Sequence, residues 1–415
     1  MGPGRAVQRA RATRVGAAAE GAVLRLAPGF HERARRRIYE PAFLGNVFQV
    51  REKDRPRACL SYVPGAFIEP HDRRWLNHTN RWECLEIGRL LDQLDFVVDV
   101  ADCLTEEFEP RAVYQLFIDA GYNLDRLGDR LGPSCTRVSY ATGRHWLAQN
   151  SAELARLEYL RRRRGVVLLP RRSTRPVLTA ETSDALLILG NEDVRDSYSH
   201  VRCPVFTIPN SFPAELIDDR PRDPEASRRT FLWLGSRGMV HKGLDLVLEV
   251  FSARPDLELH VIGPVQDEPD FAAAYEHELS ACPNIHVHGF LDLDSPDFER
   301  IAGSCGALVY PSCSEAMSGA VLAAMAKGLI PVVSRETAAD VEPAGLILAE
   351  TTVETLAAAV ERLAAMPARE LADRSTAARE IIRTRHSRAA FSAAMEAALR
   401  AVARLEPNRE PAETS

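Results

Sequence analysis

Residues 231–243 read Phe-Leu-Trp-Leu-Gly-Ser-Arg-Gly-Met-Val-His-Lys-Gly, an apolar run that leads into a glycine-bearing basic loop. The apolar run predicts a buried strand, and the pattern from Leu244 onward predicts a helix directly after the loop. Arg237 and Lys242 would then lie at a helix N-terminus, where backbone N–H groups and the helix dipole favour an anion. The stretch predicts a parallel α/β sheet with a diphosphate site at its carboxyl edge. A solvated turn is the competing interpretation.

The same alternation of short apolar runs and longer amphipathic stretches continues along the 415 residues. It predicts a first set of strands at 58–63, 96–100, 113–118, 137–140, 166–169, 185–189 and 205–208. After a break it predicts a second set at 231–234, 257–262, 285–288, 307–310, 330–333 and 345–348. Two such sets indicate two doubly wound, Rossmann-like domains that face a cleft, with ligands beyond the carboxyl ends of the strands.

The break between the two sets is rich in proline, aspartate and arginine, which is typical of a linker. We therefore expect a first domain at 56–212, a linker at 213–230 and a second domain at 231–386. A C-terminal helix at 387–405 is expected to cross back onto the first domain. A basic, loosely ordered arm at 1–55 and a tail at 406–415 complete the chain.

Composition excludes several classes of protein. The longest apolar runs are under ten residues, whereas a membrane-spanning helix needs about twenty, and no secretory signal is evident, so we expect a cytoplasmic protein. The eight cysteines form no C-x-x-C pair, which argues against a zinc or disulfide scaffold. Residues 1–57 carry a net charge of +8 and the remainder −14, so the body is acidic and nucleic-acid binding is not expected. Only three of the 52 basic residues are lysine, which draws attention to Lys242.

A second loop follows the predicted strand at 307–310. Ser318 is placed to cap the next helix and Gly328 to end it. Small residues at 318–320 would let a ligand approach the free amides of that helix. Glu315, just before the cap, could accept hydrogen bonds from ligand hydroxyls, although an exposed loop carboxylate is the simpler interpretation.

These two loops resemble motifs of the retaining GT-B glycosyltransferases of family four, often called group 1. The R-x4-K-G element of that family is matched by Arg237, Lys242 and Gly243, and its E-G-F-G…G loop and helix by residues 315–328. The resemblance extends over about residues 56–400 and is strongest at 231–335.

The resemblance implies a role for each matching residue. Arg237 and Lys242 would neutralise the donor diphosphate in a cleft open to solvent, so that neither a metal nor a cofactor is required. Glu315 would hold hydroxyls of the transferred sugar, and His145, after the strand at 137–140, would face the same sugar. The other donor-binding positions would be Met317, Ser318 and Gly319 on sugar and phosphate, and Gly263 and Phe290 near the nucleobase.

The sequence departs from the family motif at two places. The second motif glutamate is replaced by Ala323, and Gly-Phe-Gly by Ala316-Met317-Ser318. Lys327, one turn beyond Ala323, could donate to ribose oxygens instead. These departures leave open whether donor binding is weakened or abolished.

Candidates for the acceptor side are loop residues that follow first-domain strands, namely Asn123, Asn191 and His78, although each is more often part of a turn. Asn150 and Glu153 are expected to form a capping-box variant. His286 and His288 share a strand face but lack a third metal ligand. Residues 161–164, four arginines, are expected to meet water at a helix end, and with the basic arm they offer an alternative role in contact with an anionic membrane surface.

The expected protein is a metal-independent retaining hexosyltransferase of the polysaccharide-biosynthesis type. It would move a sugar from a nucleotide-diphosphate sugar to a glycan, lipid-linked or small-molecule acceptor in the cytoplasm or at the membrane periphery. A non-catalytic GT-B protein that binds a glycan or partner, and a nucleotide-sugar epimerase, are the alternatives. The sequence specifies neither the donor sugar and base, nor the acceptor, nor the oligomeric state.

Overall fold

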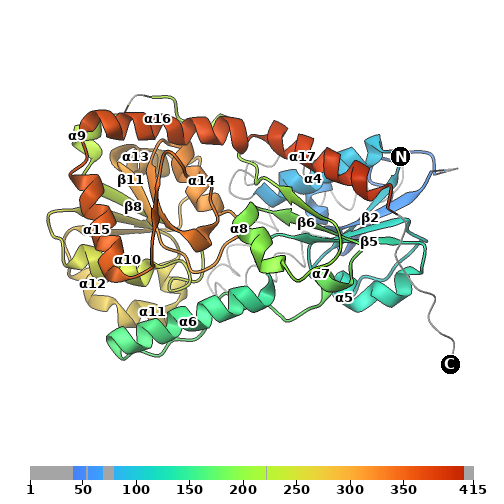
Figure 1. Cartoon of the computed structure of the whole chain (residues 1–415), viewed down its shortest axis with the longest axis horizontal. Coiled ribbons are helices and arrows are strands. Elements are labelled where there is room, and N and C mark those ends of the chain that lie inside the picture. Colours follow the sequence, from blue (N-terminus) through green and yellow to red (C-terminus); the bar gives the residue numbers. More distant parts are fainter. Residues whose placement is uncertain (1–40, 53–54, 69–78, 221, 406–415) are drawn as a thin grey trace, which may run out of the picture.

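The computed structural model describes residues 41–52, 55–68, 79–220 and 222–405. Two lobes lie side by side along the long axis of the molecule (Figure 1). Most of the predicted basic arm, the predicted tail at 406–415 and the acceptor candidate His78 lie outside the described residues.

The first lobe is built on a seven-stranded sheet with the strand order β1-β3-β2-β4-β5-β6-β7. Its strands are β1 (Phe43–Leu44), β2 (Arg57–Tyr62), β3 (Val97–Asp102), β4 (Leu116–Asp119), β5 (Thr136–Ala141), β6 (Ala185–Leu189) and β7 (Val205–Ile208). All neighbours pair in parallel except β1, which runs antiparallel to β3. The strands read as nearly continuous apolar runs because a parallel sheet is covered on both faces.

The second lobe is built on a six-stranded, wholly parallel sheet with the order β10-β9-β8-β11-β12-β13. Its strands are β8 (Thr230–Leu234), β9 (Glu258–Ile262), β10 (Ile285–Gly289), β11 (Ala307–Tyr310), β12 (Ile330–Ser334) and β13 (Leu346–Leu348). The strand order reverses between β8 and β11, which are neighbours in space but distant in sequence. The loops that leave these two strands diverge to opposite faces, and ligands bind in the crevice between such loops.

The predicted strands agree with the structure at twelve places and fail at one. Residues 166–169 form no strand, and the exposed fractions of Val167 and Leu169 are 76% and 69%. They follow Gly165, a left-handed residue that ends a helix, and belong to a surface connection. β1, only two residues long, falls within the predicted basic arm and has too short a pattern to be recognised.

The helices cover both faces of each sheet (Figure 1). Those that follow the strands of the first sheet are α4 (Thr79–Gln93), α5 (Asn123–Leu127), α6 (Trp146–Arg164), α7 (Thr179–Thr182) and α8 (Glu192–Arg195), with 3-10 turns η1 (Pro64–Phe67), η3 (Gly128–Leu131), η4 (Asp196–Tyr198) and η5 (Ala214–Leu216). Those of the second lobe are α9 (Pro224–Ser227), α10 (Leu244–Ser252), α11 (Pro269–Ala274), α12 (Glu276–Ser280), α13 (Pro296–Ser304), α14 (Gly319–Ala326), α15 (Val353–Ala364) and α16 (Ala368–Arg385), with 3-10 turns η6 (Val265–Asp267) and η7 (Arg335–Thr337). The final helix is α17 (Arg388–Val402).

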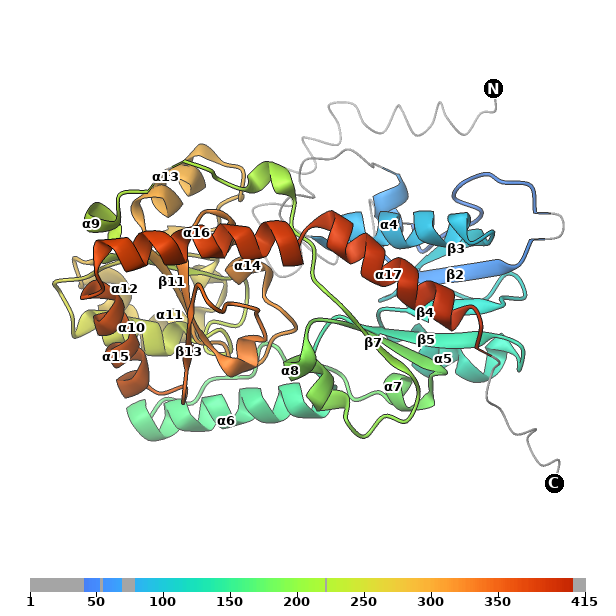
Figure 2. The ribbon, with the colours of Figure 1, turned by 45° about the horizontal axis from the view of Figure 1, so that its top comes forward.

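Two helices connect the lobes in opposite directions. α17 crosses back from the second lobe to the first (Figure 2). Its residues Phe391, Met395 and Leu399 belong to the core of the first lobe, and the helix contacts α4 and β7. α6 leaves the first lobe and lies along the second in both views. The sequence predicted that the C-terminal helix crosses back to the first lobe. It did not predict that α6 extends from the first lobe along the second.

The sequence predicted that the four arginines at the end of α6 meet water. Arg161 and Arg162 are indeed exposed, whereas Arg163 and Arg164 contact the second lobe. Arg163 donates to Asp245 at 2.8 Å and to Glu249 at 2.7 Å, both on α10 of the second lobe. Arg164 forms an ion pair with Glu278 on α12. Two of the four arginines therefore hold the lobes together, and they are not available as a membrane-binding patch. No helix in the described residues has the length and apolar character that crossing a bilayer requires.

Candidate active site

The loop after β8 presents side chains rather than amides. Glu268, which is buried, accepts hydrogen bonds from the backbone N–H groups of Gly238 and Met239 at 2.5 and 3.1 Å. The N–H groups of Lys242 and Gly243 bond to carbonyls within the loop. The expectation that these amides bind a diphosphate is therefore wrong for residues 238, 239, 242 and 243.

The loops after β8 and β11 approach each other closely. A Cβ atom at Gly243, where φ is +77°, would lie 2.4 Å from the carbonyl oxygen of Pro311. Any larger residue would force the two loops apart. Gly243 thus keeps Lys242 within reach of the second loop.

Lys242 and Glu315 form a mostly buried ion pair between the two loops. Lys242 Nζ lies 2.7 Å from Glu315 Oε1, and the side chains are 6% and 14% exposed. The same carboxylate oxygen accepts a hydrogen bond from Tyr310 Oη at 2.8 Å and from Ser312 Oγ at 3.2 Å. Burial alone would raise the pKa of Glu315, but the charges of Lys242, His241 and Arg172 and the hydrogen bond from Lys242 together outweigh it and lower that pKa to about 2. Glu315 is a carboxylate that accepts hydrogen bonds and is not poised as a proton donor.

Arg237 is the unpaired cation of the first loop. Its side chain is exposed, and it forms no ion pair or hydrogen bond with any residue that the structure describes. Arg237 is therefore free to meet an anion, whereas Lys242 is already neutralised and largely out of solvent, contrary to our expectation for that residue.

The N-terminus of α14 presents backbone amides beside this pair. Ser318 is the residue that precedes the helix, and the N–H groups of Gly319 and Ala320 have no acceptor in the described part of the chain. Met317 adopts a left-handed φ of +66°, and its carbonyl accepts a hydrogen bond from Asn210 Nδ2 at 3.0 Å. This hydrogen bond from the first lobe stabilises the left-handed conformation of Met317, which precedes the N-terminus of α14.

A further cation comes from the first lobe and was missed by the sequence reasoning. Arg172, in the connection after α6, packs on the first loop so closely that a Cβ atom at Gly238 would lie 2.5 Å from its Cγ. Its charge contributes to lowering the pKa of Glu315. The guanidinium has no partner among the described residues. Arg172, Arg237 and the Lys242–Glu315 pair thus share one site that both lobes build.

Three side chains of α6 fix the backbone that carries Arg172. Gln149 Nε2 donates to the carbonyl of Arg172 at 2.5 Å, and Asn150 bonds to both backbone groups of Thr174. Glu153 Oε1 accepts from the N–H groups of Arg171 and Arg172, each at 2.8 Å. The predicted capping box of Asn150 and Glu153 is wrong, because α6 begins at Trp146 and both residues lie inside it.

Both ring nitrogens of His145 have partners within the first lobe. His145 precedes α6 and is 6% exposed; its Nδ1 accepts from the N–H of Leu147, and its Nε2 lies 2.9 Å from Glu181 Oε1. His200 Nε2 approaches the same oxygen at 2.9 Å. His145, Glu181 and His200 form a group of three potential metal ligands within the described residues, and their ligand atoms lie within 4.8 Å of one another. Because Nδ1 accepts a hydrogen bond, Nε2 of neutral His145 carries the proton and donates to Glu181, so it offers no lone pair to a metal.

The strand histidines have a third neighbour that the sequence did not reveal. His260 on β9 lies between His286 and His288, with its Nδ1 2.9 Å from His288 Nε2. The rings are stacked with interplanar angles of 30° and 27°, so they lie face to face instead of pointing at a common centre. The trio is a stack of imidazoles and not a metal site.

Lys327 lies at the wrong end of α14 to contact a ribose. It follows the last residue of the helix, about 12 Å from the N-terminus of an eight-residue helix, and its ammonium forms an ion pair with Glu299. Ala323 is 1% exposed and belongs to the apolar core of the lobe. The predicted contact of Lys327 with the donor is therefore not made.

Two of the acceptor candidates have other partners. Asn123 is buried and donates to Ser61 Oγ and to the carbonyl of Asp102. Asn191 precedes α8 and donates to Asp340 of the second lobe at 2.9 Å. Both amides are engaged within the fold, so neither is a free acceptor-binding group in this structure.

The two nucleobase candidates both lie at the carboxyl edge of the second sheet. A Cβ atom at Gly263 would lie 2.5 Å from the carbonyl oxygen of Gly235, so glycine is needed there for packing of the loops. Phe290 follows β10 and is 60% exposed. Its ring is an exposed aromatic surface near the end of the strand.

The comparisons with known proteins agree with this architecture. The structure resembles sucrose-phosphate synthase from Thermosynechococcus elongatus with a TM-score of 0.59 and 14% identity over 84% of this chain and 99% of that one. It resembles Anabaena Alr3699/HepE, solved in complex with UDP and glucose, with a TM-score of 0.56 and 11% identity over 84% of this chain and 100% of that one. The fold is GT-B, as the resemblance in the sequence implied.

The sequence comparisons identify the second lobe more narrowly. Residues 228–366 match the family "Glycosyl transferases group 1". The "Uncharacterized glycosyltransferase YqgM" of Bacillus subtilis (strain 168) is 29% identical over 164 residues, which is 38% of this chain. The match spans 44% of that protein, less than half of its length. The resemblance to group 1 glycosyltransferases is thus confirmed for residues 228–366.

Proposed function

We propose that the protein transfers a hexosyl group from a nucleoside-diphosphate sugar to an acceptor, with retention of anomeric configuration and without a metal ion. The observation that carries the proposal is the convergence of Arg237, Arg172 and the free amides of α14 on the switch point of the second sheet. A diphosphate carries the negative charge that such a group of donors accepts. The likeness to HepE, which was solved with UDP and glucose, supports this class of donor.

The diphosphate would bind between the free amides of Gly319 and Ala320 and the two unpaired guanidiniums. These donors would be aimed at the oxygen on which charge develops as the bond to the sugar breaks. In this proposal they supply the stabilisation that a divalent metal provides in other transferases. Lys242 would contribute to the diphosphate once a ligand hydroxyl shares the carboxylate of Glu315.

Glu315 would hold the sugar rather than transfer a proton. A pKa of about 2 keeps it ionised, so it accepts hydrogen bonds from sugar hydroxyls. In the transfer step the bond between the anomeric carbon and the phosphate oxygen breaks, the bond to the acceptor oxygen forms, and the acceptor proton passes to the departing phosphate. No protein nucleophile is invoked in this step.

The acceptor would bind on the side of the first lobe, and glycans, lipid-linked sugars and small molecules are the classes to test. The site as proposed needs no cofactor, since the nucleotide sugar is a substrate.

The deciding experiment combines donor binding with product analysis on the full chain. Calorimetry with UDP, GDP and ADP is expected to detect binding of one of them. Incubation of the matching nucleotide sugars with acceptor mixtures in the presence of EDTA should yield a glycoside that retains the anomeric configuration of the donor. Binding without turnover would favour the non-catalytic alternative, and an altered sugar without acceptor would favour the epimerase. Loss of all turnover in EDTA, restored by Mg²⁺ or Mn²⁺, would contradict metal independence.

A further inference from the structure

A pocket lies on the second lobe at the edge of the sheet opposite to the candidate active site. It has a volume of about 170 Å³ and is bordered by α9, by α16 and by Ala307 and Ile330, the first residues of β11 and β12. An engineered cavity of about 150 Å³ in another protein holds a benzene molecule, so this pocket has room for a small organic ligand. Ala372 and Thr376 on its rim are exposed, which leaves it open to solvent.

Arg379 of α16 reaches this pocket as a buried cation without a counter-ion. It is 9% exposed, and its Nη1 donates to Ser375 Oγ at 3.1 Å. In the described residues no carboxylate lies within ion-pair distance of it. The guanidinium rests directly on Gly328, where any side chain would collide with it. Burial lowers the pKa of Arg379, and the charge of Asp218 only partly opposes this. Arginine stays charged in proteins, so a charge is held largely out of water without an ion-pair partner in the described residues.

A second guanidinium, that of Arg222, lines the same pocket. It donates to the carbonyls that end α13 and α14, those of Ala302 and Lys327 among them, and forms no ion pair with a described residue. Its Nε atom is buried and has no acceptor. Burial lowers the pKa of Arg222, and the charge of Arg379 lowers it further. Two like charges therefore lie close enough to repel each other.

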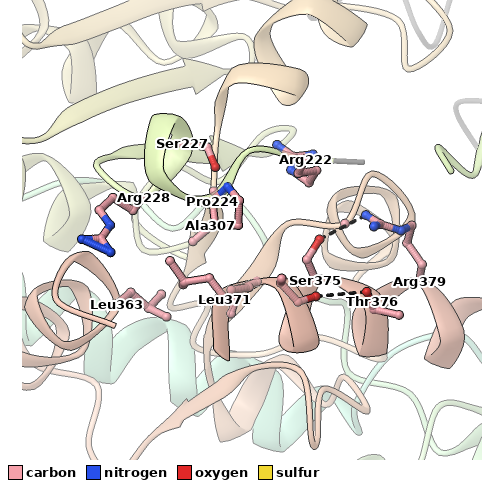
Figure 3. Close-up of a pocket in the computed structure, with 14 residues that line it drawn as sticks. Arg222, Pro224, Ser227, Arg228, Ala307, Leu363, Leu371, Ser375, Thr376 and Arg379 are labelled. Atoms are coloured by element: carbon pink, nitrogen blue, oxygen red, sulfur yellow. Dashed lines mark hydrogen bonds between the residues drawn. The ribbon is translucent and has the colours of Figure 1, made fainter. Parts of the chain in front are cut away.

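The bond pattern separates a structural role from a binding role. Neutralisation of helix C-termini explains Arg222, because cations stabilise the carbonyls exposed there. Arg379 also rests on Gly328, just beyond the end of α14, but its hydrogen bond goes to a serine hydroxyl and, within the described residues, to no carbonyl of that helix end. The lining also includes the polar side chains of Ser227, Arg228, Ser375 and Thr376. Its apolar part is formed by residues such as Leu363 and Leu371, which Figure 3 shows along the base of the pocket, opposite Arg222.

We propose that this pocket binds a small organic carboxylate. The carboxylate would lie between the guanidiniums of Arg379 and Arg222, which would remove their mutual repulsion, and the apolar body would pack on Leu363 and Leu371. An inorganic anion would leave the apolar base in contact with water, so the combination of charge and apolar surface selects an organic acid. The site is separate from the donor site and its occupancy does not rest on the proposed transfer reaction.

The test is the binding of sodium benzoate and sodium hexanoate to the full chain in the absence of any nucleotide sugar. Calorimetry measures the affinity, and thermal unfolding measures the change in unfolding temperature. Both probes should bind saturably and raise the unfolding temperature, and inorganic phosphate should bind more weakly. Arg379→Gln should weaken binding by about ten- to a hundredfold, the effect of losing a hydrogen bond to a charged group. Arg369→Gln, an exposed arginine at the start of the same helix, is the matched control and should bind as the wild type does.

A second variant guards against misfolding of the first. Ala372→Trp places a bulky side chain on the exposed rim and should block the probes while leaving the fold intact. The proposal is overturned if neither carboxylate binds saturably, if Arg379→Gln or Ala372→Trp binds as tightly as the wild type, or if phosphate competes on equal terms. Since no sugar transfer is measured, these outcomes are independent of whether the protein is a transferase.

Discussion

Lys242 Nζ and Glu315 Oε1 lie 2.7 Å apart, and both side chains are mostly buried. The lysine is therefore neutralised in the absence of a donor. The positive charge that is free to attract a diphosphate comes instead from Arg237 and Arg172, one from each lobe. The site is complete only when the lobes are together.

Because Lys242 and Glu315 form a buried ion pair, we predict that substitutions at the two positions have non-additive effects on the free energy of unfolding. Lys242→Met should lower the free energy of unfolding by about 3–5 kcal/mol, because it leaves a carboxylate buried without its partner. The double variant Lys242→Met/Glu315→Gln should recover part of this loss. Urea unfolding of the wild type, Lys242→Met, Glu315→Gln and the double variant gives the coupling energy directly. Strictly additive effects would show that the two side chains do not interact in solution.

The free cations predict a different outcome. Arg237→Gln should fold with wild-type stability, because its guanidinium has no partner to lose within the described residues. Arg172→Gln should lose little stability, because it loses no hydrogen bond or ion pair there, only its attraction to the Glu315 carboxylate. Each should weaken the binding of nucleoside diphosphate by about ten- to a hundredfold. Arg202→Gln, an exposed arginine of the first lobe, is the control for general charge effects. Unchanged affinity in Arg172→Gln would remove the first lobe from the diphosphate site.

The hydrogen bonds between Glu153 of α6 and residues 171–173 give a related prediction. Glu153→Gln replaces a carboxylate that accepts two backbone N–H bonds and the hydroxyl of Ser173. The segment should loosen, and diphosphate affinity should fall in the same direction as in Arg172→Gln but by less. Combining Glu153→Gln with Arg172→Gln should add little further loss, which calorimetry can test. Full additivity would mean that Glu153 does not act through Arg172.

The sequence predicted the sheets well because their strands are short apolar runs with a simple periodicity. It also located the loops of Arg237 and Glu315, since both follow such strands directly. It could not predict Arg172, which lies in a connection with no periodic pattern and reaches the site only because α6 crosses to the other lobe. Nor could it foresee that Glu268 would occupy the loop amides, since that pairing joins residues thirty positions apart.

The wrong assignments share a physical cause. His145, Asn123 and Asn191 follow strands and have the right chemistry, but each satisfies backbone or side-chain groups of the fold itself. Polar residues at the ends of strands serve turns and helix starts as often as they serve ligands. Only the partners seen in the structure separate the two uses.

Glu83 predicts a pH dependence of stability. It is fully buried on α4, where it accepts hydrogen bonds from Tyr62 and Ser211, and burial raises its pKa from 4.5 to about 7. Between these two values the folded state binds more protons than the unfolded state, so stability falls as pH rises. Glu83→Gln removes this dependence. The free energy of unfolding of Glu83→Gln minus that of the wild type should therefore increase from pH 4.5 and level off above pH 7, and the whole increase should be no more than about 3 kcal/mol. A difference that shrinks with rising pH would contradict the burial of this group.

Ala323 gives the last prediction, because it stands where the family motif has its second glutamate. Its side chain is 1% exposed and packs in the apolar core of the second lobe. Ala323→Glu should therefore fail to restore a ribose contact. It would instead bury a carboxyl group without a partner and lower the free energy of unfolding by several kcal/mol at neutral pH, about 3 or more. The loss should be smaller at pH 5, where a buried carboxyl with a raised pKa stays neutral. Ala320→Glu, in the first turn of the same helix and half-buried, is the control, and a carboxylate at this helix start should cost little. Urea unfolding at the two pH values measures the effect. If Ala323→Glu were as stable as the wild type and bound nucleoside diphosphate more tightly, the side chain at this position would reach the donor after all, and the helix would have to sit differently in the folded protein.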